Sequence, residues 1–575
     1  MSPCGDCGKL AVFNPHQSEM FMPSADTIIV NARVITMNPA APFAEAVAIA
    51  GSRIAAVGAK PDIAALKAKH TRIIDAGMNT VIPGIVESHV HLFGGAVELD
   101  SLMLNNIKGF QAIAESVSEY RKKRPKSAIV VATGMAHESF GGDGPITRQL
   151  LDRIVADVPF IMVCFDHHTV WANTRAFDKA GIMRGRALPT GNEIVLDSNG
   201  LATGELREPA AYMPVLELTP TGGREWLGVT TGESPSPAAT PAQRRTDETF
   251  MRRGIAHAAS LGITSLHNMD GNWYQLELLH SLQRRGELHA RVEVPFHHKN
   301  FFEVERVDEA VEMHRKYRGD MLHSGRVKIF MDGVLETTTA LMLDDYPGYP
   351  GNTGAPLFTA EAFNQIATRA DALGLRISVH AIGDGAVRRT LDGFAAARKA
   401  NGPRDSRHRI EHIEVIDPAD IPRFSELGVI ASMQPVAGLG VPGNPLEPCL
   451  SRIGHKLPYS YAWQTIRDSG AMMAFSSDWP VAPLDPFAGI QAAMTARPLR
   501  PDCPNQAQSL MDAIHGFTLG SAYCEAAEDR KGMLKPGHFA DIAILDADLE
   551  KTPAGRIATV KPVLTICDGR ITFER

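Results

Sequence analysis

Residues 81–92 read Val-Ile-Pro-Gly-Ile-Val-Glu-Ser-His-Val-His-Leu, so a short apolar segment runs directly into two histidines. The apolar run, punctuated by Pro83 and Gly84, predicts a strand that enters a core. Because side chains alternate along a strand, His89 and His91 are expected on the same face. Two imidazoles at a strand end suit a divalent metal, although a His-x-His pair also arises by chance in a long chain. The remaining sequence has to decide between these two interpretations.

Segments of strand character recur later in the chain and alternate with amphipathic helices. With residues 81–90 as the first, the eight expected strands continue at 263–266, 291–296, 326–331, 375–379, 408–411, 429–433 and 471–475. This alternation predicts parallel pairing through right-handed crossovers, and eight repeats indicate closure into a (β/α)8 barrel. No repeat of fixed period is visible that would favour a solenoid or a propeller. The expected fold class is therefore α/β, with a TIM-like barrel.

Polar residues stand at the ends of five of these strands. Strand one ends in His89 and His91, and the other four residues are Lys328 on strand four, His380 on strand five, His412 on strand six and Asp478 after strand eight. In a (β/α)8 barrel the C-terminal strand ends meet at one face and carry the active residues. Any one of these histidines alone could be a structural residue with a satisfied hydrogen bond. Together the six side chains predict a metal site.

Four motifs resemble those of the amidohydrolase superfamily, and in particular its YtcJ-like branch (amidohydrolase family 3). The motifs are Pro-Gly-Ile-Val-Glu-Ser-His-Val-His at 83–91, Val-Lys-Ile-Phe-Met-Asp-Gly at 327–333, Arg-His-Arg-Ile-Glu-His at 407–412 and Ser-Ser-Asp-Trp-Pro-Val at 476–481. The branch includes N-substituted formamide deformylases, and the resemblance extends from about Ala25 to the C-terminus. The chain departs from the branch at Glu87, where Asp is usual, at Ser476, where Gly is usual, and at Gly438, where histidine is frequent.

The resemblance implies a role for each of these residues. By position, His89, His91 and Asp478 are similar to ligands of a first metal, and His380 and His412 to ligands of a second. Lys328 resembles a bridging ligand that carbon dioxide converts to N6-carboxylysine. The alternative for Lys328 is a salt bridge of the unmodified side chain to Asp332 or Glu336. Histidine and oxygen ligands suit two zinc ions, while manganese, iron and cobalt stay open.

A further motif, Phe-Asp-His-His-Thr-Val-Trp-Ala-Asn at 165–173, is also similar to the YtcJ-like branch. By the same matching, His168 and Asn173 are expected to bind substrate. A helix cap and a buried hydrogen bond are the alternative roles for these two residues.

Such a ligand set permits hydrolysis, because a divalent metal lowers the pKa of its bound water and polarises a carbonyl. Asp478 is the expected proton shuttle. The resemblance implies a hydrolase acting on a carbon–nitrogen bond of amide type, such as that of an N-substituted formamide or an N-acyl amine. An ester, lactone or cyclic-amide hydrolase is a variant on the same site. The alternative of another class is a non-catalytic assembly protein that keeps the barrel.

The domain organisation follows from where these strands fall in the chain. We expect a tail at 1–24, a β-sandwich from both chain ends at 25–83 and 532–575, a hydrolase barrel at 84–93 and 246–531, and an α/β insertion at 94–245. The insertion follows strand one and so is expected to shape the substrate pocket. Its last part, 222–245, is rich in Gly, Ser and Pro, which indicates a mobile lid or a plain surface loop.

Composition restricts the possible partners. The chain has 575 residues, 44% hydrophobic and 21% charged, and a net charge of −7, which argues against a nucleic-acid partner. Its apolar stretches are too short to span a bilayer, so we expect no membrane partner and a cytoplasmic location. Seven scattered cysteines indicate free thiols rather than a disulfide framework, and Cys4 and Cys7 fall in the tail. The expected assembly is a homodimer that acts on a small-molecule substrate.

Overall fold

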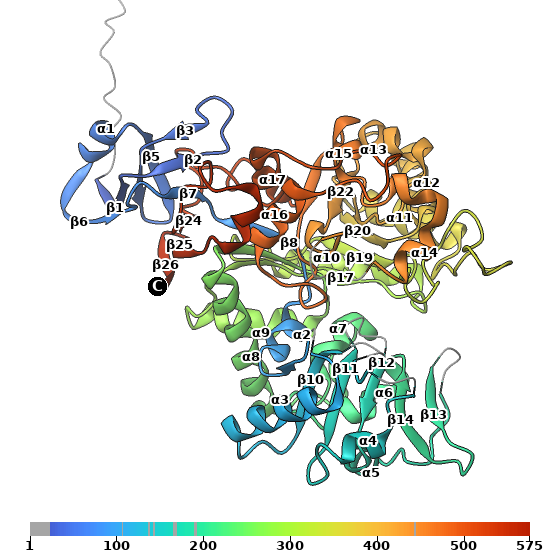
Figure 1. The fold of residues 1–575 in the computed structure, drawn as a ribbon. Coiled ribbons are helices and arrows are strands. Elements are labelled where there is room, and N and C mark those ends of the chain that lie inside the picture. Colours follow the sequence, from blue (N-terminus) through green and yellow to red (C-terminus); the bar gives the residue numbers. More distant parts are fainter. Residues whose placement is uncertain are drawn as a thin grey trace, which may run out of the picture.

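The computed structural model describes residues 24–575 except 106, 136–138, 142–143, 165–168, 189–191, 442–443 and 445. The strands predicted for the barrel form two parallel sheets, one of four strands in the order β18-β16-β15-β8 and one of six in the order β17-β19-β20-β21-β22-β23 (Figure 1). Their bounds are β8 Ile85–Val90, β15 Ile263–Asn268, β16 Arg291–Glu293, β17 Phe296–His297, β18 Leu322–His323, β19 Arg326–Phe330, β20 Arg376–Ala381, β21 Arg409–His412, β22 Ile430–Met433 and β23 Met473–Phe475.

The two parallel sheets are linked at both ends. Neither sheet closes on itself, so the predicted barrel is represented here by two open sheets. The expected third strand is divided between them as β16 and β17, and the fourth contributes β19 to the larger sheet. At the other end, Val90 after β8 forms an isolated parallel bridge with Trp479 after β23. The first and last strands of the series are therefore neighbours.

The prediction of one strand at 81–90 was wrong in one respect. Residues 81–90 form two strands in different sheets, because β7 (Thr80–Pro83) pairs with β2 (Arg33–Ile35) and β24 (Ile542–Leu545), whereas β8 pairs with β15. The break falls at Gly84, where an added Cβ would lie 2.3 Å from the Thr264 hydroxyl oxygen. Only glycine allows β15 to approach the backbone so closely at the point where the chain changes sheets.

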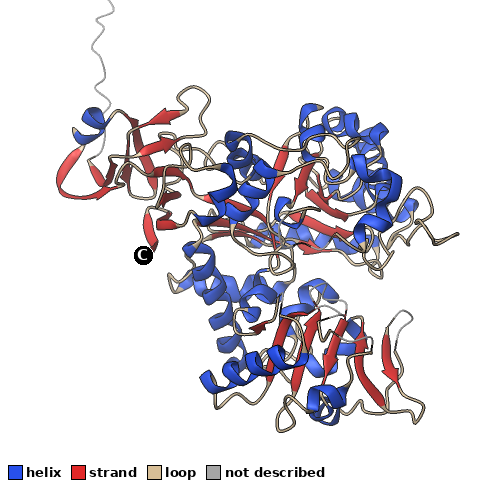
Figure 2. Ribbon diagram, in the orientation of Figure 1, coloured by secondary structure: helices blue, strands red, loops and turns tan. Residues whose placement is uncertain are grey.

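Helices follow the strands of the larger sheet and lie on its outer side (Figure 2). The helices of this half of the chain are α9 Trp273–Arg284, α10 Asp308–Lys316, α11 Ala360–Ala372, α12 Asp384–Asn401, α13 Ile421–Leu427, α14 Cys449–Ile453, α15 Trp463–Asp468, α16 Pro486–Thr495, α17 Leu510–Gly516 and α18 Leu519–Tyr523. Alternation of strand and helix was the basis of the fold prediction, and the observed order follows it.

Both chain ends contribute to two further sheets that lie together at one side of the molecule (Figure 1). One has the order β5-β4-β1-β6 and the other β26-β25-β24-β7-β2-β3. The remaining bounds are β1 Ala25–Val30, β3 Phe43–Ala44, β4 Ala46–Ala50, β5 Arg53–Gly58, α1 Lys60–Ala64, β6 Lys67–Asp75, β25 Pro562–Cys567 and β26 Arg570–Glu574. Side chains of both sheets, including Ile29, Val47, Val81 and Ile544, form one buried apolar cluster. The buried pair Arg291–Asp541, 2.7 Å apart, joins β24 to β16.

Residues between β8 and α8 (Pro241–Ser260) form a separate six-stranded sheet in the order β13-β14-β12-β11-β10-β9. The helices and strands of this segment are α2 Leu92–Glu98, β9 Leu102–Met103, α3 Phe110–Lys123, β10 Val130–Met135, α4 Arg148–Asp152, β11 Phe160–Cys164, β12 Thr169–Ala172, α5 Thr174–Ala180, β13 Glu193–Leu196, β14 Ala202–Arg207 and α6 Pro209–Leu216. Alternate residues of β11 enter apolar clusters on opposite faces, Ile161 with α5 and α6 and Met162 with α3 and α4. The expected α/β pattern is therefore present, and β13 and β14 pair as an antiparallel hairpin.

The turn-rich interpretation of residues 222–245 was partly wrong. Short helical segments occupy Arg224–Trp226 (η1) and Leu227–Thr230 (α7), and α8 begins at Pro241. Thr240 and Gln243 form a reciprocal capping box, so the Thr-Pro pair marks a helix start. Proline at the first helical position costs no hydrogen bond, because that N–H has no partner inside the helix.

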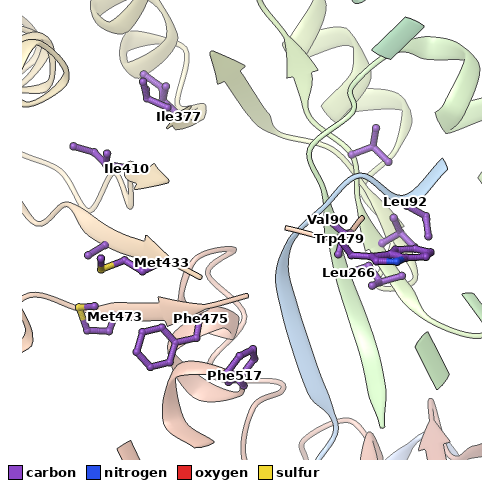
Figure 3. Packing of buried hydrophobic residues seen from close by; sticks show 14 of the residues in the cluster. Val90, Leu92, Leu266, Ile377, Ile410, Met433, Met473, Phe475, Trp479 and Phe517 are labelled. Carbon is purple, nitrogen blue, oxygen red and sulfur yellow. The ribbon is translucent and has the colours of Figure 1, made fainter. Parts of the chain in front are cut away.

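The main apolar core lies between the parallel sheets and their helices. Figure 3 shows Trp479 beside Val90 and Leu266, and Phe475 beside Phe517. An added Cβ at Gly95 of α2 would lie 2.5 Å from the Trp479 ring, so the indole packs directly on this helix. This packing fixes the loop after β23 against the segment that follows β8.

Two expectations from the sequence, on membrane spans and on the state of the cysteines, can be compared with the described residues. No helix among the described residues is both long enough and apolar enough to cross a bilayer. The five cysteines among them, Cys164, Cys449, Cys503, Cys524 and Cys567, are free thiols. Cys4 and Cys7 and the expected tail at 1–24 lie outside the described residues, apart from residue 24.

Candidate metal centre

The six predicted ligand residues converge at one end of the parallel strands. The imidazole centroids of His89 and His412 are 4.9 Å apart, and those of His412 and His380 are 4.5 Å apart. Asp478 Oδ2 lies 3.9 Å from His412 Nδ1. Lys328 lies on β19, next to the β20 strand that carries His380, and its side chain is fully buried. The parallel strands bring these residues together because all their C-terminal ends face the same way.

Asp478 is held between the two histidines of the first strand. Its Oδ1 lies 3.3 Å from His89 Nε2 and 3.2 Å from His91 Nε2. The Asp478 N–H donates to the His89 carbonyl and the His91 N–H donates to the Trp479 carbonyl, at 2.9 and 2.8 Å. His89, His91 and Asp478 thus offer ligand atoms that all lie within 4.8 Å of one another. The expectation that both histidines share a face is confirmed.

Each imidazole has one ring nitrogen engaged by an oxygen acceptor. The contacts are His89 Nδ1 to Glu411 Oε2 at 2.9 Å, His91 Nδ1 to Asp270 Oδ1 at 2.5 Å, His412 Nδ1 to Gln434 Oε1 at 2.9 Å and His380 Nε2 to the Gly333 carbonyl at 3.2 Å. Because carboxylate and carbonyl oxygens only accept, the engaged nitrogen is the donor. Burial lowers the pKa of His89, His380 and His412, so the other nitrogen of these three rings keeps its lone pair. Burial opposes the charge of His91 as well, but Asp270 and Asp478 outweigh it and raise the pKa of that imidazole to about 10. Metal-ligating histidines are oriented in this way.

Among the six predicted ligand residues, three buried polar atoms have no hydrogen-bond partner among the described residues: His89 Nε2, Asp478 Oδ1 and Lys328 Nζ. An unpaired buried polar group costs free energy, more so when it is charged. Two of the three atoms are a lone-pair nitrogen and an anionic oxygen that face each other. A divalent cation between them would satisfy both atoms, so the donor set fits a metal.

Lys328 does not form the salt bridge that the sequence left open. The two oxygens of Asp332 accept backbone N–H groups of Leu341, Ile382 and Gly383 instead. The Lys328 ammonium position lies 4.9 Å from the Phe330 ring centroid. Burial lowers the pKa of the Lys328 amine to about 8, although Glu411 and Asp478 act in the opposite direction. The amine is therefore easier to deprotonate than an exposed lysine.

Asp478 and Glu411, the two carboxylates beside His89, are kept ionised by neighbouring histidine and arginine side chains. Burial by itself would raise the pKa of Asp478, but His89, His91 and His412 outweigh it and hold that pKa well below its usual range. Burial also opposes ionisation of Glu411, and Arg409 together with His89 overcomes it. Arg409 Nε lies 2.6 Å from Glu411 Oε1. A buried cation thus supports the acceptor that orients His89.

The backbone is unusual where two of the ligands stand. His412 has φ 74°, its neighbour Ile413 has φ 52° and Asp478 has φ 62°. Positive φ is uncommon for residues other than glycine and is least favourable for a β-branched residue such as isoleucine. Such conformations persist where surrounding contacts over-determine them, and they concentrate at functional sites.

The third strand adds two buried basic residues beside the centre. His297 Nδ1 lies 3.1 Å from the Gly228 carbonyl, and Lys299 Nζ donates to the Val229 carbonyl. Both carbonyls belong to α7, at the end of the inserted segment. The His297 ring meets Phe330 edge-on, with centroids 4.9 Å apart. The insertion is therefore anchored beside the side chains that surround Lys328.

Sequence reasoning missed the residues that orient the histidines. Asp270 follows β15, Glu411 precedes His412 and Gln434 follows β22, so each lies at a strand end. Their position was the available signal, since acceptors at strand ends lie next to ligands at strand ends. His297 and Lys299 had the same signal at the end of the third strand.

Of the two residues predicted to bind substrate, the structure describes only Asn173. His168 lies outside the described residues. Asn173 is fully buried and caps α5, with its side-chain oxygen accepting from the Phe160 and Ala176 N–H groups at 3.0 and 2.9 Å. Its amide nitrogen donates to the carbonyls of Val155 and Val158 at 2.7 and 2.9 Å. Its amide thus has no donor or acceptor left for a substrate, so the structural alternative applies.

The chain belongs to the amidohydrolase family, whose sequence profile matches residues 72–573. The family expected from the four motifs is therefore confirmed. Together with the fold and the candidate His-His-Asp site, this defines a metal-binding hydrolase class.

The chain is similar to three named proteins along most of their length. The chain is 26% identical to the protein LONG AFTER FAR-RED 3 of Arabidopsis thaliana, covering 91% of this chain and 88% of that protein. It is 26% identical to the putative amidohydrolase YtcJ of Bacillus subtilis strain 168, covering 86% and 89%. It is 23% identical to the N-substituted formamide deformylase of Arthrobacter pascens, covering 96% and 98%.

Solved structures share the fold. A metal-dependent hydrolase from Pyrococcus furiosus, described as uncharacterised, has a TM-score of 0.67 and 25% identity, covering 89% of this chain and 97% of the other. Atrazine chlorohydrolase TrzN from Arthrobacter aurescens TC1, complexed with zinc, has a TM-score of 0.52 and 15% identity, covering 95% of both chains.

The role of Asn173 can be measured. Asn173→Ala removes a helix cap and leaves two buried N–H groups without an acceptor, so we expect a loss of about 2–4 kcal/mol in the free energy of unfolding in urea. Asn199→Ala, in the exposed turn before β14, is the matched control and should change stability by no more than about 0.5 kcal/mol. Unchanged stability of Asn173→Ala with an altered ranking of substrates would contradict the structural role.

Proposed function

We propose that the protein is a metal-dependent hydrolase that cleaves a carbon–nitrogen bond of amide type, such as that of an N-substituted formamide or an N-acyl amine. The observation that carries the proposal is the convergence of His89 Nε2, Asp478 Oδ1 and Lys328 Nζ, three buried polar atoms without a hydrogen-bond partner among the described residues. We further propose that the two parallel sheets act as one (β/α)8 barrel that presents these atoms at its C-terminal end, and that the two outer sheets form a β-sandwich.

The ligand roles extend this proposal. His89, His91 and Asp478 would hold one metal, His380 and His412 a second, and Lys328 would bridge the two. The orientation of the imidazoles supports this assignment, because each of them has one ring nitrogen held by a protein oxygen outside the ligand set. Imidazole and carboxylate ligands suit zinc, and the similar structure of TrzN is complexed with zinc.

Bound metal supplies Lewis-acid activation of a carbonyl and lowers the pKa of water. The protein's own residues then have two tasks. Glu411, Asp270 and Gln434 hold the imidazoles in orientation, so that their lone pairs do not have to be reorganised during the reaction. Asp478 Oδ2, the oxygen that is not enclosed between His89 and His91, accepts the proton of the attacking water and returns it to the leaving nitrogen.

Carboxylation of Lys328 would account for a buried Nζ that has no hydrogen-bond partner among the described residues. A primary amine reacts with carbon dioxide in its neutral form, and burial brings the pKa of this amine down to about 8. The product is an anionic carbamate with two oxygen donors, which suits a position between two cations better than an ammonium group does. The family resemblance of the 327–333 motif supports the same assignment.

The substrate class rests on the similarity to an N-substituted formamide deformylase. The insertion at 94–245 is proposed as the cap that selects substrates, and its contacts support this, because α7 meets His297 and Lys299 beside the centre. An ester, lactone or cyclic amide is the alternative substrate type on the same site.

A non-catalytic assembly protein is the candidate function of another class. The free energy of desolvation argues against this alternative. A barrel without chemistry has no reason to keep four oriented histidines, an unpaired lysine and an unpaired carboxylate oxygen in its interior, since each costs desolvation free energy.

Metal content and turnover test the proposal directly. We expect about two divalent metals per chain by elemental analysis, loss of hydrolysis on chelation and recovery on adding zinc. The substrates to compare are N-formyl amines, N-acyl amino acids, lactones and aryl esters, with the N-formyl amines the fastest. A metal-free protein with chelator-insensitive turnover would refute the metal role, and faster turnover of lactones would refute the bond specificity.

Lys328→Ala should remove the bridge and lower the metal content by at least one ion per chain. A short carboxylic acid such as acetate, added to this variant, should restore part of the metal and of the rate, because it supplies the two missing oxygens. Lys535→Ala, at an exposed position, is the matched control and should keep both. Full metal content and a normal rate in Lys328→Ala would show that the lysine does not bridge.

Asp478→Asn should lower kcat on an N-formyl amine by about 100- to 10,000-fold, because an amide cannot relay the proton. An activated aryl ester leaves without being protonated, so its loss should be smaller in the same variant. Asp344→Asn, an exposed carboxylate, is the control. Equal losses on both substrates, or a loss that matches the missing metal, would reduce Asp478 to a ligand.

A further inference from the structure

A cavity lies between the insertion and α2, the helix that follows His89 and His91. It has a volume of about 190 Å³ and is enclosed by α2, α3, β10, η1 and α8. Its lining includes Val97, Glu98, Val131, Glu225, Trp226 and Phe250. None of the six candidate metal ligands lines it. Glu98 ends α2 and His91 precedes the first residue of that helix, so the rise of about 1.5 Å per residue separates them by about 10 Å.

Glu225 gives this cavity a charged end. The side chain is only 2% exposed, and its Oε2 has no hydrogen-bond partner among the described residues. Thr221 hydrogen-bonds to the same carboxyl group. The neighbouring Arg224 is directed to another carboxylate, because its Nε and one terminal nitrogen bind Asp247 at 2.7 and 2.8 Å. Glu225 therefore lines the cavity with a buried carboxyl group whose Oε2 has no hydrogen-bonded cation among the described residues.

A second carboxyl group, Glu98, lines the same cavity from the α2 side and is 9% exposed. Burial and the proximity of Glu225 raise the pKa of Glu98 to about 8. Burial likewise raises the pKa of Glu225 to about 7. Two carboxyl groups that share a space of low polarity resist ionising together, and a cation placed beside them removes that resistance.

The opposite end of the cavity opens to solvent and is already balanced in charge. Asp100 there binds Arg253 through two contacts, one of them at 2.7 Å, and the Tyr120 hydroxyl donates to the Asp100 carbonyl at 2.6 Å. The walls between the two ends are apolar, formed by Val97, Val131 and Phe250 with the Trp226 ring. The lining thus combines apolar side chains with the buried carboxyl groups of Glu98 and Glu225.

We propose that this cavity binds a small organic cation, a primary ammonium group carried on one apolar ring or a short alkyl chain, with the ammonium on Glu225 and Glu98. The size supports the class of ligand, since a cavity of about 150 Å³ accommodates benzene. An extra methylene and an ammonium group fill the remaining space. An anion would meet two carboxyl groups, and a neutral ligand would leave Glu225 Oε2 without a charged partner among the described residues.

The competing explanation is that Glu98 and Glu225 share a proton and serve only to join α2 to the insertion. That arrangement would need no ligand and would show no preference for charge. A titration with a cationic probe and its neutral analogue distinguishes the two explanations.

The experiment is isothermal titration of the metal-loaded protein with benzylammonium chloride and, separately, with benzyl alcohol. We expect benzylammonium to bind at least tenfold more tightly than the alcohol, because only the cation can pair with the buried carboxylates. Glu225→Gln keeps the shape and the bond to Thr221, and it should weaken benzylammonium binding about tenfold or more. Glu217→Gln, an exposed position at the end of α6, is the matched control and should leave the affinity unchanged.

Several results would overturn the proposal. Equal affinities for the two probes would refute the charge requirement, and this comparison needs only the wild-type protein. An unchanged affinity in Glu225→Gln would place benzylammonium elsewhere, for example at the metal centre. Absence of any heat at millimolar probe would leave the shared-proton contact as the explanation.

Discussion

The geometry of the centre depends on one buried guanidinium. Arg409 lies inside the parallel strands, where its Nε donates to Ser378 Oγ at 2.7 Å and a terminal nitrogen donates to the Ser88 carbonyl at 2.9 Å. Its charge is balanced by Glu411, which in turn binds His89. Because an unpaired buried charge costs several kcal/mol, β8, β20 and β21 must sit where these acceptors can be reached. The position of His89 is thus set by a residue that is not itself one of the candidate ligands.

Those parts of the site that follow from strand periodicity could be predicted from sequence. His89 and His91 share a face because side chains alternate along a strand, and His380 and His412 meet because adjacent parallel strands end together. The orienting acceptors could not be predicted with the same ease. Asp270, for example, lies two residues beyond β15, where no periodicity governs the direction of a side chain. Only the folded chain shows that it reaches His91.

The errors of sequence interpretation have local physical causes. Residues 81–90 have the pattern of one strand, yet the close approach of Thr264 at Gly84 divides them between two sheets. Threonine and proline are common in turns, so the composition around Thr240 and Pro241 predicted a loop. Their positions relative to Gln243 instead make a helix cap. Asn173 was linked to substrate through its motif, whereas its hydrogen bonds serve the backbone around α5. In each case a tertiary contact or a cap outweighed a one-dimensional signal.

The pairing of Asp478 and Trp479 with the segment after β8 also constrains the order of events during synthesis. His89 and Asp478 are about 390 residues apart, and ribosomes add about 5–20 residues per second, so the two are made about 20–80 s apart. During this interval His89 and His91 lack the carboxylate that lies between them, and β8 lacks its neighbour on that side. A metal ion that arrives early meets an incomplete coordination shell. Completion of the candidate site therefore belongs to the end of chain assembly, and a chain that terminates before β23 loses both the last strand and Asp478.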